Sequence, residues 1–115
     1  MKNIFNEEYI EKTIFNNRWV RFAFGNNGII KTKNLNMCIT EFSIGDSSPI
    51  QKHDVDEAIY VLSGNGSIKI DEETHRIRDG DFIYVPQGSN HSMETDQKNK
   101  LKILTVFSGT TKLEY

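Results

Sequence analysis

Residues 80–91 read GDFIYVPQGSNH, a strand-like run that ends in a turn and is followed at once by a histidine. The FIYV part is aromatic and β-branched, which favours a strand. Pro86 closes this run, because proline cannot donate a hydrogen bond within a sheet, and Gly88 gives the turn its conformational freedom. His91 opens the next strand-like run, HSMET. The stretch therefore predicts two strands joined by a tight turn, with a histidine beside that turn.

The rest of the chain consists of similar short runs. Turn signals such as GNNG, SGNG and DGD separate them, at intervals of roughly 8–12 residues. The main runs, rich in β-branched and aromatic residues, are RWVRFAF (18–24), MCITEFSI (37–44), EAIYVLS (57–63) and LKILTVFS (101–108). Many short strands with regular turns indicate a β-sandwich or barrel. We expect one all-β domain over residues 1–115, an antiparallel jelly-roll barrel closed between residues 18 and 108, and a short helix within residues 4–16.

Composition narrows the function classes. The chain has 115 residues, a net charge of -2, a pI of about 5.9 and a mean hydropathy of -0.54. These values predict a soluble protein and favour neither nucleic acid nor an anionic membrane as a partner. The single cysteine, Cys38, permits no disulfide within the chain and is expected in the core. Since no apolar run has signal-peptide or membrane-spanning length, the expected location is the cytoplasm.

A second polar pattern lies in QKHDVDEAIYVLSG, residues 51–64. Gln51, His53 and Glu57 have the same parity, so on one continuous strand their side chains would point to one face. If the strand that begins at His91 lies beside this one, four donor side chains converge. Two neutral imidazoles and one carboxylate suit a divalent Fe, Mn, Ni, Co or Zn ion, and an amide oxygen is a weaker donor. We therefore expect one divalent metal ion as a cofactor, with His53, Glu57, His91 and Gln51 as candidate ligands.

Together the two stretches resemble the two sequence motifs of the cupin superfamily, within residues 35–108. The first motif is Gly, five residues, His-x-His, three or four residues, Glu, six residues and Gly. The second is Gly, five residues, Pro-x-Gly, two residues and His. The corresponding residues are Gly45, Gln51, His53, Glu57 and Gly64 in the first motif and Gly80, Pro86, Gly88 and His91 in the second. The resemblance implies a cupin barrel with a site of three histidines and one glutamate, in which Gln51 replaces one histidine.

The same polar residues also have a plainer interpretation. His53 and Glu57 could lie on a solvated strand edge, and a barrel can keep this fold without a metal. Two roles for Gln51 stay open, a weak metal ligand or a hydrogen-bond partner in the pocket. His75, in the polar run THRIR, is expected at the surface.

The resemblance leaves the function open between an enzyme and a binding module. Cupins include dioxygenases, isomerases and lyases as well as non-enzymes, because fold does not determine function. We expect a small polar organic ligand, such as a sugar acid, a keto acid or a phenol, in a pocket lined by Tyr84, Phe82 and Met93. The alternative is a non-enzymatic module that binds a sugar or metabolite, with a structural metal or none. The resemblance also implies a homodimer, in which the N-terminal segment packs on the outside of the barrel or on a second subunit.

Overall fold

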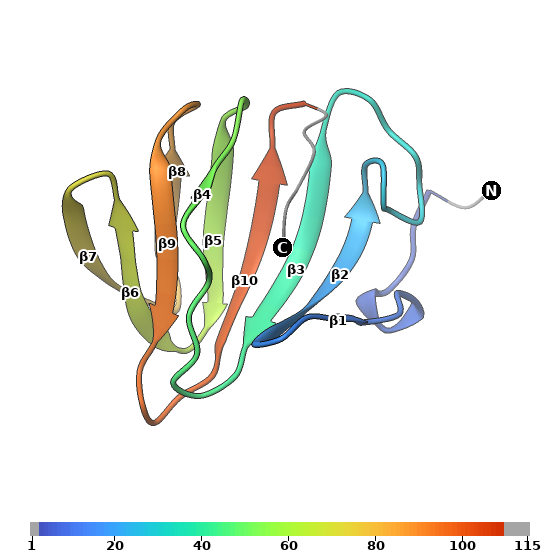
Figure 1. Ribbon diagram of the computed structural model, residues 1–115. Coiled ribbons are helices and arrows are strands. Elements are labelled where there is room, and N and C mark those ends of the chain that lie inside the picture. The colour runs from blue at the N-terminus through green and yellow to red at the C-terminus, as the bar shows by residue number, and fades with distance from the viewer. Residues whose placement is uncertain (1–2, 110–115) are drawn as a thin grey trace.

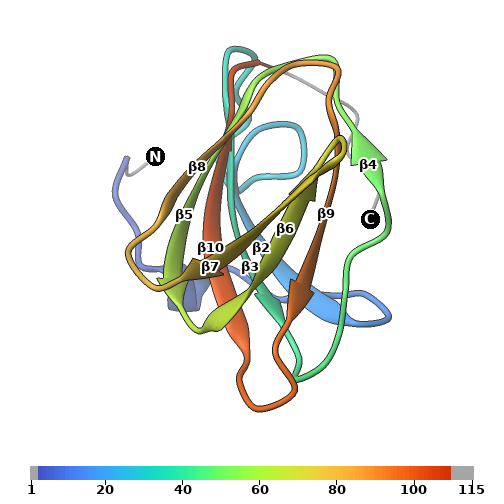
Figure 2. The ribbon, with the colours of Figure 1, turned by 90° about the vertical axis from the view of Figure 1, so that its left-hand side faces the viewer.

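The computed structural model describes residues 3–109, which form two antiparallel sheets that face each other (Figures 1 and 2). The strands of the larger sheet, in spatial order, are β1 (Thr13–Ile14), β2 (Arg18–Phe24), β3 (Asn36–Phe42), β10 (Leu101–Phe107), β5 (Glu57–Ser63) and β8 (Phe82–Val85). Those of the smaller sheet are β4 (Gln51–Lys52), β9 (Asn90–Thr95), β6 (Asn65–Ile70) and β7 (Glu73–Arg78). This arrangement confirms the expected all-β jelly-roll architecture.

Strict alternation of burial defines the interior face of the larger sheet. Successive side chains of a strand point to opposite faces, so one row of each strand lies between the sheets. The buried rows of the two central strands are Asn36, Cys38, Thr40 and Phe42 in β3 and Leu101, Ile103, Thr105 and Phe107 in β10. In β5 the interior row begins with a carboxylate, because Glu57 is buried together with Ile59 and Val61. The apolar members of these rows pack against Ile68, Ile77 and Met93 of the smaller sheet.

Gly64 links the two sheets between β5 and β6. Its φ of 103° lies in the left-handed region, and a Cβ there would meet the carbonyl oxygen of Lys100 at 1.9 Å. Only glycine therefore allows the chain to leave one sheet and enter the other at this point. The glycine that closes the first motif has a backbone role.

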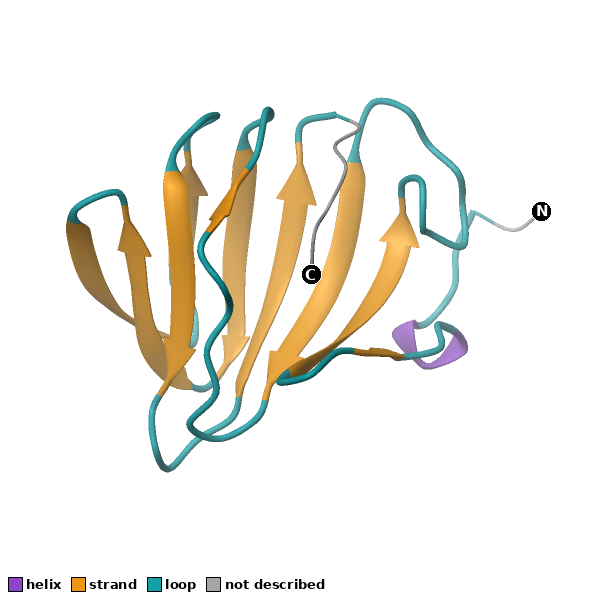
Figure 3. Cartoon of the chain, viewed as in Figure 1, coloured by secondary structure: helices purple, strands orange, loops and turns teal. Residues whose placement is uncertain are grey.

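The predicted helix within residues 4–16 is wrong. The structure has only a three-residue 3-10 turn, η1 (Glu7–Tyr9), followed by β1, and Figure 3 shows no longer helix in the described residues. Tertiary contacts override the weak helical pattern, since Arg21 on β2 donates to the Ile10 carbonyl and pairs with Glu7. Within residues 3–109 no helix is long and apolar enough to span a membrane.

Candidate metal centre

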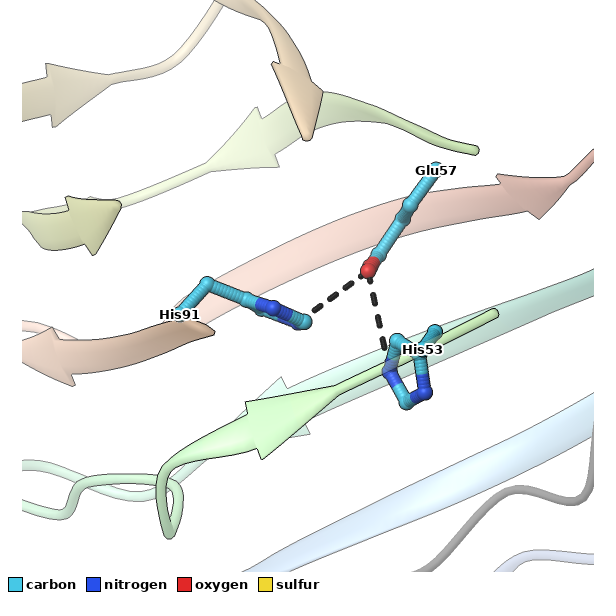
Figure 4. A group of neighbouring side chains, drawn as sticks. All are labelled: His53, Glu57 and His91. Atoms are coloured by element: carbon cyan, nitrogen blue, oxygen red, sulfur yellow. Dashed lines mark ion pairs between the residues drawn. The ribbon is translucent and has the colours of Figure 1, made fainter. Parts of the chain in front are cut away.

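Three buried side chains from separate segments meet between the two sheets (Figure 4). His53 follows β4, Glu57 is the first residue of β5, and His91 is the second residue of β9. One donor atom from each lies within 4.8 Å of the others. The Glu57 carboxylate points between the two imidazoles, and Oε1 is 3.1 Å from Nε2 of His91 and 3.8 Å from Nε2 of His53.

The route of the chain to this point differs from the sequence interpretation. Shared parity on one continuous strand does not bring His53 and Glu57 together, because β4 ends at Lys52 and residues 53–56 cross to the other sheet. The two side chains therefore approach each other from opposite walls. The strand that begins near His91 does lie beside the first, and Gln51 is directly paired with His91 in register.

Hydrogen bonds hold the crossover between β4 and β5 in place. The N–H of Gly88 donates to the carbonyl of His53 at 2.8 Å. Asp56 is bound at both ends, because its carboxylate accepts from the N–H of Gln87 at 2.9 Å and its carbonyl accepts from the N–H of Ser108 at 3.0 Å. The turn of the second motif is thus attached to the loop of the first motif.

The electrostatics differ between the two histidines. Burial lowers the pKa of His53 below its ordinary value and outweighs the attraction of Glu57. Burial also acts to lower the pKa of His91, but the hydrogen bond and charge of Glu57 outweigh it, so the pKa of His91 is raised. His53 is therefore a neutral donor at neutral pH, and His91 competes for a proton with any cation that binds.

The donor set fits a divalent metal ion. Glu57 Oε1 is buried, and apart from Nε2 of His91 and Nε2 of His53 no group in the described range is in reach to satisfy it. Two imidazoles and one carboxylate form the donor set of many divalent transition-metal sites. The Nδ1 atom of His91 lies 3.5 Å from the Ser89 carbonyl, which orients the ring with Nε2 toward Glu57. The side chains of His53, Glu57 and His91 could together hold such an ion.

A small cavity of about 30 Å³ adjoins this cluster. Gln51 and Met93 line it beside Glu57 and His91, so two of the residues expected at the pocket are there. The cavity also extends along the larger sheet, where it is lined by Arg18, Thr40, Phe42, Ile103, Thr105 and Phe107. The Phe107 ring packs edge-on against the His53 ring, with centroids 5.0 Å apart.

The predicted pocket role of Phe82 and Tyr84 is wrong. Both rings lie on the outer face of β8, where Phe82 is 85% exposed and Tyr84 is 61% exposed. Val85 and Ile83 take the inward positions, because Val85 pairs with the inward-facing Glu57 in register. Phe82 packs instead on Tyr60, with ring centroids 4.8 Å apart.

One cavity residue was missed by the sequence interpretation. Arg18, the first residue of β2, is only 5% exposed and lines the cavity. A charged residue at the start of an amphipathic strand is usually expected to point its side chain toward solvent. The usable signal was parity, because Arg18 shares the interior face of its strand with the fully buried Val20.

Two other predictions concern residues outside the cluster. Cys38 is buried, as expected of a core thiol. The His75 side chain is 53% exposed and pairs with Glu73 at 3.2 Å, which agrees with a surface position.

Comparison with known proteins gives a family and two uncharacterised relatives. A family model described as a cupin domain matches residues 38–107. An uncharacterized protein of Streptomyces coelicolor is 28% identical over 79 residues, which are 69% of this chain and 74% of that protein. An uncharacterized protein of Methanocaldococcus jannaschii is 36% identical over 62 residues, which are 53% of this chain and 50% of that protein. The second match thus spans half of the relative's length.

Solved structures share the architecture at low identity. The polyketide cyclase RemF from Streptomyces resistomycificus superposes with a TM-score of 0.83 at 18% identity, over 98% of this chain and 83% of that one. An RmlC-like cupin from Shewanella frigidimarina gives 0.81 at 17% identity, over 96% and 93%. The DMSP lyase DddQ from Ruegeria pomeroyi gives 0.80 at 16% identity, over 94% and 62%. At these identities the likeness concerns the fold alone.

Proposed function

This chain belongs to the cupin family, and on that premise we propose that His53, Glu57 and His91 bind one divalent metal ion that serves chemistry on a small polar organic molecule. The observation that carries the proposal is the Glu57 carboxylate. It is buried between two imidazoles, and among the described residues no group other than these imidazoles is in reach of its Oε1. A buried carboxylate in this state is costly, and a cation beside it lowers that cost.

The lining of the cavity next to the cluster, rather than its volume of about 30 Å³, supports a small-molecule ligand. Its wall combines apolar side chains with a few polar ones, among them Thr40, Thr105 and Gln51. Such a mixture is typical of sites that orient a small ligand. A divalent ion at His53, Glu57 and His91 would supply Lewis-acid or redox chemistry to the ligand. The protein would contribute orientation of the ligand and exclusion of water.

The site also contains one group that can hold a proton and one that can form hydrogen bonds with a bound ligand. His91 is the histidine whose pKa Glu57 raises, so in the metal-free protein it holds a proton more firmly than His53 does. Gln51, paired with His91 across β4 and β9, offers an amide that can donate to or accept from a ligand oxygen. An enzyme of the dioxygenase, isomerase or lyase type is the function that this set of groups favours.

One feature favours the alternative of a binding module without catalysis. Gln51 stands where cupins carry a histidine, and an amide oxygen is a weaker donor to transition metals than an imidazole. A weaker site favours plain ligand binding over redox chemistry. Under this alternative the barrel binds a sugar or metabolite, and the metal is structural or not needed.

Metal analysis of the purified protein tests the proposal. The protein is prepared without oxygen to retain iron, and its content of Fe, Mn, Co, Ni and Zn per chain is measured. We expect about one ion per chain, and loss of that ion on chelation should abolish turnover or binding of a small organic substrate. A protein that holds no metal after reconstitution with each of the five ions contradicts the metal site, and a ligand that binds equally well after chelation favours the binding module.

A further inference from the structure

The outer face of the larger sheet, which points away from the smaller sheet, is rich in apolar side chains. The outward rows of its neighbouring strands β3, β10 and β5 include Met37, Ile39, Glu41, Lys102, Leu104, Val106, Ala58, Tyr60 and Leu62. When one face of an antiparallel sheet is in contact with water, that face is normally polar. A second, largely apolar face therefore indicates that other groups pack on it.

The N-terminal segment covers one half of this face. Five residues between Asn3 and Ile10 line a groove of about 350 Å³, whose other wall is formed by β2, β3 and one residue of β10. Glu7 holds the segment there, because its Oε1 accepts from Arg21 at 3.1 Å and from Lys102 at 2.9 Å. Figure 2 shows the segment on the side of the larger sheet away from the smaller sheet. We call this the covered half, and the outer face of β5 and β8 the bare half.

The bare half presents three large apolar side chains to solvent. Phe82 and Tyr84 of the edge strand β8 are 85% and 61% exposed, and Leu62 of β5 is 39% exposed. The ring of Phe82 packs on that of Tyr60 with centroids 4.8 Å apart, so the aromatic surface continues from β8 to β5. Aromatic residues are enriched at protein interfaces, and apolar side chains gathered on one face mark such a surface, whereas scattered ones do not.

The covered half presents a similar set. Ile4 and Tyr9 of the N-terminal segment are 86% and 79% exposed, and Ile14 of β1 is 74% exposed. Ile14 pairs in register with Trp19, whose ring lies beside the outward Arg21, so the Ile14 side chain is on the same outer face. The segment thus packs on its own sheet and still leaves apolar groups in contact with water.

The order of the strands makes the two halves complementary across a twofold axis. β1 and β8 are at opposite ends of the larger sheet (Figure 1). When two copies stack outer face to outer face about an axis along the strands, the N-terminal segment and β1 of each lie over β5 and β8 of the other. Each raised segment then meets a bare surface. Such a contact is self-complementary and closes as a dimer.

The exposed area is sufficient for a specific interface. At about 150–250 Å² per aromatic side chain, the exposed fractions of Tyr9, Phe82 and Tyr84 amount to about 350–550 Å² per copy. Two copies bring about 700–1,100 Å² from these rings, before the three aliphatic side chains are counted. A specific interface needs roughly 1,000 Å² in total. The two halves together reach that size.

We propose that the outer face of the larger sheet binds a second copy of this chain, with residues 3–14 of each protomer packed on β5 and β8 of its partner. The dimer contains two identical contacts, and each joins the covered half of one protomer to the bare half of the other. This inference is independent of the proposed function, because the candidate metal ligands are buried between the sheets.

Two charged variants and their mixture test this arrangement. Tyr9→Lys alters only the covered half and Phe82→Glu only the bare half. We expect the unaltered protein to sediment as a dimer at micromolar concentration, and each variant alone to have a dimer dissociation constant at least tenfold higher. An equimolar mixture should form mixed dimers, because such a pair keeps one unaltered contact and has opposite charges in the other. Native mass spectrometry separates the mixed dimer by mass, and its amount should exceed the sum of the two like dimers, which is the share that random pairing gives.

Each other outcome overturns the proposal. If only Tyr9→Lys weakens the dimer, the two segments meet each other, and if only Phe82→Glu does, the two β8 strands meet. Mixed dimers at the share of random pairing exclude a contact between unlike halves. A monomeric unaltered protein, or dimers that persist in both variants, show that this face does not join two copies.

A matched control separates the interface from a general effect of surface charge. Ile50→Glu introduces a charge at a residue that is 75% exposed and precedes β4 of the smaller sheet, and it should leave the dimer unchanged. Circular dichroism verifies that each variant is folded. If either test variant does not fold, Ile14→Lys replaces Tyr9→Lys and Tyr84→Glu replaces Phe82→Glu, with the same expected results.

Discussion

The N–H of Gly88 donates a 2.8 Å hydrogen bond to the carbonyl of His53, so the turn that precedes His91 is attached to the loop that leads to Glu57. Gly88 has a φ of 83°, in the left-handed region that favours glycine. One hydrogen bond thus couples the positions of the candidate ligands on three segments. The turn of the second motif therefore positions the loop of the first motif, in addition to leading to the candidate ligand His91.

Gly88→Ala should weaken metal binding by altering this turn. A Cβ at Gly88 would meet no atom of residues 3–109 within 4 Å, so the cost is backbone strain of about 1–2 kcal/mol rather than a clash. Gly80→Ala is the control, because Gly80 has a φ of 91°, equally open surroundings and a hydrogen bond to Val61 instead. We expect similar losses in thermal stability for both variants, but a loss of metal affinity only for Gly88→Ala. Equal metal affinities would show that the bond to His53 does not position the ligands.

His53→Ala and His91→Ala should each remove most of the bound metal and leave the barrel folded. Loss of a direct ligand should exceed the roughly 100-fold loss that follows removal of an outer partner. His75→Ala is the matched control, because His75 is exposed and lies on β7, away from the cluster. Metal content per chain and circular dichroism provide the measurements. Retention of one ion per chain by both cluster variants contradicts the assignment.

Metal affinity should rise with pH above 6.5. The pKa of His91 lies above its ordinary value of 6.5 in the metal-free protein, so between 6.5 and that raised value a binding ion displaces a proton. His53 contributes no further released proton in this range, because its pKa lies below 6.5 and its imidazole is already neutral. Calorimetry in buffers of different ionisation enthalpy should detect the released proton. A flat affinity between pH 6.5 and 8 contradicts His91 as a ligand.

The stability of the metal-free protein should fall as pH rises above 6.5, whereas metal affinity should rise. A raised pKa of His91 contributes stability that is complete below the unfolded value of 6.5 and is lost as pH rises through the folded value. The lowered pKa of His53 acts only below 6.5, where stability is lost as pH falls. Urea denaturation of the metal-free protein should therefore show a decline in stability above pH 6.5. His91→Gln should show no such decline.

Gln51→His should tighten the binding of Co, Ni, Fe or Zn. An imidazole nitrogen in place of an amide oxygen is a better donor for these ions, with a gain on the order of 1–3 kcal/mol, comparable to a charge-assisted hydrogen bond. Lys52→His is the matched control, because Lys52 is the next residue of β4 and is exposed. Titration of both variants with the same ion by calorimetry separates the cases. An affinity unchanged by Gln51→His would leave Gln51 as a hydrogen-bond partner of the ligand.

We expect a homodimer that covers the N-terminal segment. Phe5 packs on Phe24 of β2, yet Ile14 on the edge strand β1 is 74% exposed. A second copy would bury this apolar edge. Ile14→Glu should therefore produce a monomer, whereas Ile50→Glu, at a residue that is 75% exposed elsewhere, should not. Sedimentation at micromolar concentration measures the mass, and a monomeric unaltered protein contradicts the expectation.

Much of the architecture was predictable from the sequence alone because strand periodicity and turn chemistry are local. Alternation in residues 36–42 and 101–107 matches the buried rows of β3 and β10. Pro86 and Gly88 marked the turn before His91. These features depend on near neighbours in the chain, so a single sequence contains them. The three side chains that meet in the interior were instead selected through the resemblance of the two motifs to those of cupins.

The tertiary structure decided which face of each strand is the interior and what lies opposite it. A period of two defines two faces but does not say which one is buried, so Phe82 and Tyr84 were expected inside although they lie outside. Likewise, only the crossover of residues 53–56 brings His53 and Glu57 together from opposite sheets. Arg18 joins the cavity through pairings with strands far along the chain. Such convergence depends on non-local pairing, and residue type and spacing do not encode it.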